Sequence, residues 1–206
     1  MAWTTLGTVA PGDVLRANSG TAAYNNVIGN LVAGHPLVST LPGSPADGDT
    51  IYYQTTAMAT AGVVWTLRYR SGGGTYKWEF TGGPSLSNVA LGANVTATTN
   101  THATKTGGPS LTIPLAGEYV IAWGALVGAS VSAAYAGILP FYNGTAVGTA
   151  SDLELAQGTT VFVSVATQTN VTFATAGNTL DLRYRVDSGT GTFGRRFLYA
   201  TPVRVG

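Results

Sequence analysis

Apolar and polar residues alternate along most of this chain with the period of two residues that is typical of β-strands. The alternating runs are bounded by Gly, Pro, Asn and Asp, which favour turns. In the first part of the chain this pattern predicts strands at residues 50–54, 63–70 and 76–80, the last two forming a hairpin around 71–75. We therefore expect a small antiparallel β module over residues 41–84.

From Leu86 onward, short β-rich runs alternate with turns as far as the C-terminus. The predicted strands cover residues 89–98, 111–113, 117–127, 134–142, 145–149, 159–166, 170–174, 179–186 and 192–205. Asn143-Gly144 is the strongest signal in the chain for a two-residue hairpin turn. Many short strands at this spacing predict a jelly-roll β-sandwich over residues 85–206.

A helical pattern occurs only near the N-terminus. Apolar residues at i, i+3, i+4 and i+7 form one stripe, namely Tyr24, Val27, Ile28 and Leu31. Ser19 or Thr21 is a suitable N-cap, and Gly34 followed by Pro36 would end the helix. This stripe is too small to fold alone, so we expect residues 1–40 to be an anchor segment that docks on another surface. The predicted fold class is therefore all-β, with one short helix in this anchor.

Composition limits the partners that the chain is expected to have. Asp, Glu, Lys and Arg make up 9% of the residues, against roughly a quarter in an ordinary soluble domain. The formal net charge of +1 gives no electrostatic footprint for nucleic acid or an anionic membrane. The chain has no cysteine, which excludes disulfides, thiolate catalysis and zinc–thiolate sites. It also shows no signal peptide and no membrane-spanning run, so we expect synthesis in a cytoplasm without secretion.

Two short sequences occur twice. Leu-Arg-Tyr-Arg occupies residues 67–70 and 182–185, and on a strand it places its arginines on one face and its bulky residues on the other. We expect the apolar face to be buried and the arginines to lie exposed or paired with carboxylates, while contact with a partner subunit or an acidic ligand remains the alternative. Thr-Gly-Gly-Pro-Ser-Leu, at 81–86 and 106–111, predicts a turn followed by the start of a strand.

Candidate catalytic and metal-binding residues are sparse. His35 and His102 stand apart from other ligand types and are interpreted as exposed loop histidines. Asp47-Gly48-Asp49 is interpreted as a turn, since it lacks the further ligands of a calcium loop. A glycosidase needs two carboxylates at a defined separation, and no pair stands out among Glu79, Glu118, Asp152 and Glu154.

The densest basic spot is Arg195-Arg196, which we expect on an exposed strand or at a subunit contact, with sugar or nucleic-acid binding as the alternative. The sequence holds no nucleophile elbow, phosphate loop or dinucleotide fingerprint. We therefore expect no enzymatic activity, no catalytic residue, no metal and no cofactor.

Several segments resemble structural proteins of tailed bacteriophages. The N-terminal segment resembles theirs at Trp3-Thr4-Thr5, at residues 12–15 and at residues 24–31. A second block is similar to a small module of minor tail and head-fibre proteins, especially in phages of actinobacteria; it comprises Leu41-Pro42, Pro45, Asp47-Gly48, 51–53, 65–69, 76–80 and 82–84. The remainder, with Ile113-Pro114, residues 116–119 and residues 178–180, resembles trimeric jelly-roll heads of the tumour-necrosis-factor type.

The resemblance implies a non-enzymatic virion structural protein, which we expect to be a homotrimeric capsid decoration protein, or minor capsid protein, on the virion surface. The alternative is a minor tail or tail-tip protein with a receptor- or glycan-binding head. A polysaccharide hydrolase is a third reading, which would need a close carboxylate pair. The expected partners are copies of the chain itself, major capsid or tail proteins, and a host surface glycan, with no nucleic acid and no membrane.

Two sets of residues follow from this expectation. Apolar residues of the N-terminal segment would anchor the chain to the particle, namely Trp3, Leu15, Tyr24, Val27, Ile28 and Leu31. Few charges and the apolar stretch 124–129 suit burial between subunits, for instance along a trimer axis. The residues expected at that interface are Trp123, Leu126, Val127, Tyr135, Arg195 and Arg196.

Overall fold

The computed structural model describes residues 35–147, 153–157 and 162–206. The chain divides between Leu37 and Val38 into two units, and the described residues fall almost entirely in the second. The predicted helix and all six predicted anchoring residues lie outside the described residues. Within these residues the fold is an all-β sandwich, as the sequence predicts.

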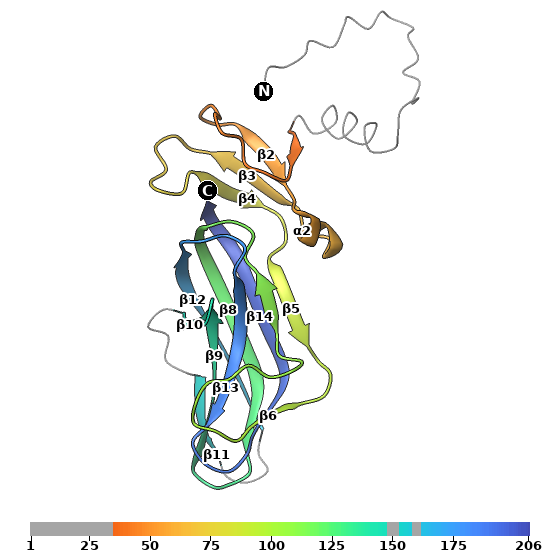
Figure 1. Ribbon diagram of the computed structural model, residues 1–206, viewed down its shortest axis with the longest axis vertical. Helices are drawn as coiled ribbons and strands as arrows, with labels where there is room; N and C mark the ends of the chain where they lie inside the picture. The colour runs from red at the N-terminus through yellow and green to blue at the C-terminus, as the bar shows by residue number, and fades with distance from the viewer. Residues whose placement is uncertain (1–34, 148–152, 158–161) are drawn as a thin grey trace, which may run out of the picture. The chain divides into compact units, whose positions relative to one another are not determined.

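The larger sheet has nine strands in the described residues. Its main path runs β1 (Leu37–Val38), β2 (Thr50–Tyr53), β3 (Trp65–Tyr69), β4 (Trp78–Gly82), β14 (Gly191–Val205), β8 (Gly117–Ala129) and β12 (Val163–Phe173). Two further strands, β5 (Leu86–Ala90) and β6 (Val95–Ala97), pair with β14 beside this path. The long strands β8, β12 and β14 lie next to one another in Figure 1.

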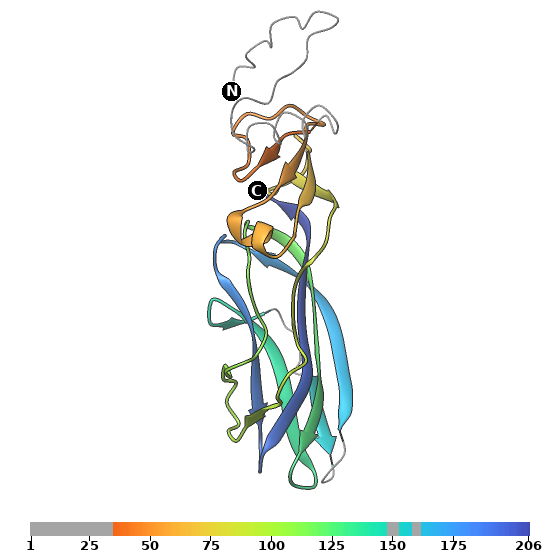
Figure 2. The ribbon, with the colours of Figure 1, turned by 90° about the vertical axis from the view of Figure 1, so that its right-hand side faces the viewer.

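The smaller sheet has five strands in the same residues. It consists of β10 (Thr145–Ala146), β9 (Ala134–Tyr142), β13 (Thr179–Val186) and β7 (Ser110–Thr112) in that order, with β11 (Leu153–Gln157) also paired to β9. Figure 2 shows β9 and β13 as a layer separate from β8, β12 and β14. Asn143 and Gly144 join β9 to β10 with φ of 47° and 81°, which confirms the predicted hairpin turn.

The core lies between the two layers and is filled by alternate side chains of the central strands. On β8, Ile121, Trp123 and Val127 are 0% exposed, and on β13 Leu180 and Tyr184 are equally buried. This alternation follows from the pleat of a strand, which sends successive side chains to opposite faces. The period of two in the sequence therefore identified the core face of β13, whereas Trp123 and Val127 of β8 were predicted at a subunit interface and lie in the core instead.

The residues of the predicted small module also form strands, and β3 pairs with β4 as the predicted hairpin. Residues Arg204 and Val205 at the end of β14 pair with Glu79 and Trp78 of β4, so the module's strands continue the larger sheet. The division at residues 84 and 85 remains a prediction. A short helix that the pattern did not predict, α2 (Thr56–Thr60), begins where the Thr55 hydroxyl accepts a hydrogen bond from the Met58 amide.

Candidate functional site

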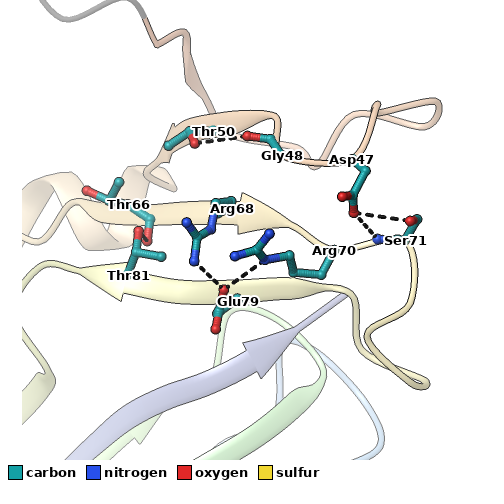
Figure 3. A network of polar contacts seen from close by, with 9 residues as sticks. All are labelled: Asp47, Gly48, Thr50, Thr66, Arg68, Arg70, Ser71, Glu79 and Thr81. Carbon is teal, nitrogen blue, oxygen red and sulfur yellow. Dashed lines mark hydrogen bonds and ion pairs between the residues drawn. The ribbon is translucent and has the colours of Figure 1, made fainter.

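The first Leu-Arg-Tyr-Arg copy forms a polar cluster on the exposed face of β3 and β4 (Figure 3). Arg68 lies opposite Glu79 in the ladder, and its Nη2 donates to Glu79 Oε2 at 2.9 Å. Arg70 Nε donates to the same oxygen at 3.3 Å. These hydrogen bonds, chiefly that from Arg68, hold the pKa of Glu79 below its ordinary value because they favour the charged carboxylate. On the opposite face Trp65 and Leu67 are fully buried, as predicted.

Asp47 links the preceding turn to the tip of this hairpin, as Figure 3 shows. Its Oδ1 accepts hydrogen bonds from the Ser71 amide at 2.7 Å and the Ser71 hydroxyl at 3.1 Å. The bond from the amide is the main cause that lowers the pKa of Asp47. Asp49 Oδ2 accepts from the Ala46 amide at 2.8 Å, and Gly48 has a φ of 88°. Both carboxylates therefore hold the backbone of a turn, as the sequence predicts.

The second Leu-Arg-Tyr-Arg copy lies on β13 and likewise has a buried apolar face opposite a face of paired arginines. Arg183 Nε donates to Asp181 Oδ2 at 2.8 Å, and its guanidinium carbon lies 4.4 Å from the centre of the Phe141 ring. Arg185 Nη1 donates to Asn100 Oδ1 at 2.7 Å. Leu182 is 1% exposed on the inner face of the sheet. Both pairs of arginines therefore have partners within the chain itself.

Arg196 corrects the prediction of an exposed basic pair, because it is 2% exposed. Its guanidinium donates to three backbone carbonyls, those of Phe193 at 2.6 Å, Ala93 at 3.0 Å and Gly107 at 3.3 Å. The cause is a register shift between β14 and β8, at which Arg195 has a φ of 43°. This β-bulge inserts one extra residue into β14, which reverses the inward and outward alternation of its side chains. Arg196 therefore points inward while Arg195 stays exposed.

The other residues predicted at a subunit interface fall into two groups. Trp123 and Val127 are 0% exposed and belong to the core of the chain itself. Leu126 lies half-buried on the outer face of β8, and Tyr135, at the start of β9, is 48% exposed. Of the six residues predicted at the interface, Leu126, Tyr135 and Arg195 offer surface to a neighbouring chain, and their interface role stays a prediction.

The remaining candidates are the two histidines and the scattered carboxylates, of which Asp152 lies outside the described residues. His35 and His102 are half-buried instead of exposed, and the ring of His102 lies 5.6 Å from that of Phe141. No group of three or more His, Asp or Glu side chains in the described residues is placed to hold a metal ion. A pocket of about 230 Å³ includes Lys105 and Asp181 in its lining, and this aspartate is already bonded to Arg183. No helix in the described part of the chain is long and apolar enough to cross a bilayer.

No family model and no curated protein sequence matches this chain. Solved structures similar to it include dimeric latent PorU from Porphyromonas gingivalis, at 10% identity and a TM-score of 0.37, covering 66% of this chain and 14% of that chain. The VP2 subviral particle of infectious bursal disease virus matches at 12% identity and a TM-score of 0.37, over 79% and 41% of the two chains.

The C-terminal domain of EclA, a sugar-binding protein, matches at 13% identity and a TM-score of 0.30, covering 63% of this chain and 89% of that chain. The structural neighbours thus include a viral capsid protein and a sugar-binding domain. Because all three TM-scores lie below 0.5, we argue function from the residues of the chain itself.

Proposed function

We propose that this chain is a non-enzymatic structural protein of a bacteriophage virion: a homotrimeric capsid decoration protein, made in the host cytoplasm and bound to the particle surface through its N-terminal region. Its partners in this proposal are other copies of the chain and the major capsid protein. The observation that carries the proposal is a contrast between the outer faces of the two sheets.

On the part of the larger sheet formed by β5, β14 and β8, the outer face is largely apolar, whereas the charged cluster of the same sheet lies on β3 and β4. Val89 on β5 is 45% exposed and lies opposite Phe197 on β14, whose ring centre is 5.5 Å from that of Tyr199. Leu126 on β8 belongs to the same face. Charged residues flank this area: the opposed pair Glu118 and Arg204 lies toward one end of β14, and the exposed Arg195 follows Gly194, the partner of Leu126, toward the other end. Such a face gains free energy by burial against another protein, at about 25 cal/mol per Å² of apolar surface.

The outer face of the smaller sheet has the opposite character. Arg183, Asp181 and Arg185 cover it with charges that already have partners within the chain. Because these charges already have partners, burial of this face against another chain would gain little free energy. The contrast favours an assembly in which the β5, β14 and β8 part of the larger sheet meets neighbouring subunits and the smaller sheet faces water.

The pairing of the charged residues also supports a structural role. Glu79 and Asp181 serve as acceptors for arginines, while Asp47 and Asp49 hold a turn. A general acid or base needs a perturbed pKa and access to a substrate, and lowered pKa values on exposed carboxylates describe resting anions. In this proposal these side chains therefore stabilise the sheets and the turn.

Imaging of virions that contain and lack this chain tests the proposal. We expect additional density on the capsid surface, centred on threefold positions, in particles that contain the chain. A difference confined to the tail tip would replace the decoration role with the tail role. Identical particles in the two preparations would contradict a virion role altogether.

The second candidate is a minor tail or tail-tip protein whose sandwich binds a receptor or glycan. Tyr135 favours it, because this tyrosine is 48% exposed beside Asp187, whose Oδ1 accepts a hydrogen bond from the Tyr135 amide at 2.8 Å. An exposed aromatic ring next to a carboxylate suits the apolar and hydroxyl surfaces of a sugar. Glycan-array binding that is lost in Tyr135→Ala and kept in Tyr52→Ala would support this candidate, and no binding by the unaltered chain would oppose it.

A further inference from the structure

Strand β12 forms one edge of the larger sheet. It pairs with β8 along all of its 11 residues, without a register shift, and no other strand of the described residues pairs with its outer edge. Within the described residues, the backbone N–H and C=O groups on that edge therefore have no strand partner. The edges of sheets are where proteins most readily add a strand from a second chain.

β12 lacks the features that usually protect such an edge. Natural edge strands are kept short, charged, interrupted by proline or bulged. The sequence of β12, VSVATQTNVTF, contains no charged residue, no proline and no glycine. The other strands at the edges of the described sheets, β1, β5, β6, β7, β10 and β11, have two to five residues each. The long unprotected edge is therefore particular to β12.

The inner side chains of β12 are also incompletely covered. Val163, Val165 and Val171 face the core, since they lie opposite Val127, Ala125 and Tyr119 of β8, yet each is only half-buried. Val165 and Val171 pack against the edge of the hydrophobic core. A further strand beside β12 would cover these valines, and it would need apolar residues at matching positions.

A second copy of β12 supplies that match. When two copies run antiparallel about a two-fold axis at Gln168, Val165 lies opposite Val171 and Val163 lies opposite Phe173 on the inner face. On the outer face Ser164 meets Thr172, Ala166 meets Asn170 and Gln168 meets itself. Apolar residues then face apolar residues, small polar ones face polar ones, and no charge is brought close to its own copy.

We propose that β12 is a self-association edge, at which two copies of the chain join their larger sheets by antiparallel pairing centred on Gln168. Residue i of one copy then contacts residue 336 − i of the other, which is the isologous arrangement of a two-fold contact. This inference does not depend on the virion role. In a trimeric assembly, a two-fold contact of this kind joins subunits of neighbouring trimers instead of building the trimer itself.

Cysteine cross-linking of the full chain tests this register, because the natural sequence contains no cysteine. In Gln168→Cys, the two sulfur atoms would lie across a strand pair, where Cβ atoms are about 4.5–5.5 Å apart and a disulfide needs only a small adjustment. We expect mild oxidation of the native protein to give disulfide-linked dimers at least about tenfold faster than in Ser87→Cys. The matched control Ser87 is exposed on β5 of the same sheet.

A mixture of two variants makes the test specific for the antiparallel register. Ala166→Cys and Asn170→Cys should each cross-link slowly alone and rapidly when mixed, because residue 166 lies opposite residue 170 only in the proposed pairing. All of the substituted positions are exposed, so we expect the variants to keep the folded circular-dichroism spectrum of the parent.

Equal cross-linking rates for Gln168→Cys and Ser87→Cys would overturn the proposal. The proposal would also be overturned if the mixture of Ala166→Cys and Asn170→Cys forms disulfides no faster than either variant alone. A rate of disulfide formation that is unchanged in denaturant would overturn it too. An edge covered by residues 1–34 of the same chain, or by a strand of a different protein, would give these negative results, since neither brings two copies of residue 168 together.

Discussion

Arg195 and Arg196 are neighbours in the chain but lie in opposite surroundings. The bulge in β14 leaves Arg195 exposed and directs the guanidinium of Arg196 to three backbone carbonyls of the chain. A buried cation costs desolvation free energy, which these charge-assisted hydrogen bonds offset. Arg196 therefore connects β14 to the segments that contain Ala93 and Gly107.

Replacing each arginine with methionine separates these roles. Arg196→Met should lower the free energy of unfolding by about 1–3 kcal/mol, because carbonyls lose their donors and the relief of desolvation only partly compensates. Arg195→Met should change it by less than about 0.5 kcal/mol. Urea denaturation of both variants gives the comparison, and equal losses would contradict the assigned burial.

Glu79 gives the surface network a pH dependence. Its pKa in the folded chain lies below the ordinary 4.5, so the stabilisation by Arg68 and Arg70 is present above that pH and is lost as the pH falls through the folded pKa. Glu79→Gln should lower the free energy of unfolding at pH 7 by at most about 1 kcal/mol, since exposed pairs are screened by solvent. The difference from the parent should shrink toward zero in acid. A difference that grows as the pH falls would contradict the pairing.

Among the strands, β8 carries a glycine, Gly124, that allows close packing on the outer face of the larger sheet. A Cβ on Gly124 would lie 2.5 Å from the Phe197 ring and 2.5 Å from the Val165 carbonyl oxygen. The absence of a side chain at residue 124 thus lets an aromatic ring of β14 lie against β8.

Gly124→Ala should therefore cost about 1–3 kcal/mol of stability through overpacking. Gly92→Ala is the matched control, because a Cβ there has no atom within 4 Å, and it should leave stability unchanged or raise it by up to about 1 kcal/mol. Thermal unfolding of both variants measures the difference. A loss in Gly92→Ala as large as that in Gly124→Ala would argue against the close approach.

The sequence predicted elements well where one face of a strand is apolar and the other polar. Residues 179–186 were predicted with the bounds that β13 has, and the arginine faces of both repeats followed from the same alternation. β12 was predicted as two strands, at 159–166 and 170–174, because Thr167-Gln168-Thr169 carries no apolar signal. Its continuity comes from pairing with β8, which no local pattern encodes.

Other differences have equally local causes. The strand predicted at 89–98 is divided into β5 and β6, with Leu91 72% exposed between them. β11 was not predicted. The α2 helix does have a signal that could have identified it, namely the Thr55 cap before an alanine-rich run. Arg196 had no such signal, because its burial depends on a bulge that arises only when β14 pairs with β8.

The molecule as a whole presents surfaces that are suited to contact with other copies of the chain. The smaller sheet carries paired charges on its outer face, while the larger sheet carries an apolar area over β5, β14 and β8 and, at β12, an 11-residue edge without protection. These features would favour aggregation in a protein that works as a single chain, and they become contacts in a closed assembly.

Sedimentation analysis of the purified full chain tests whether these surfaces join copies of the chain. We expect a discrete assembly of several 21.0-kDa chains at micromolar concentration, with a mass that does not drift upward as the concentration is raised. A stable single chain that stays monomeric throughout the micromolar range would contradict the account.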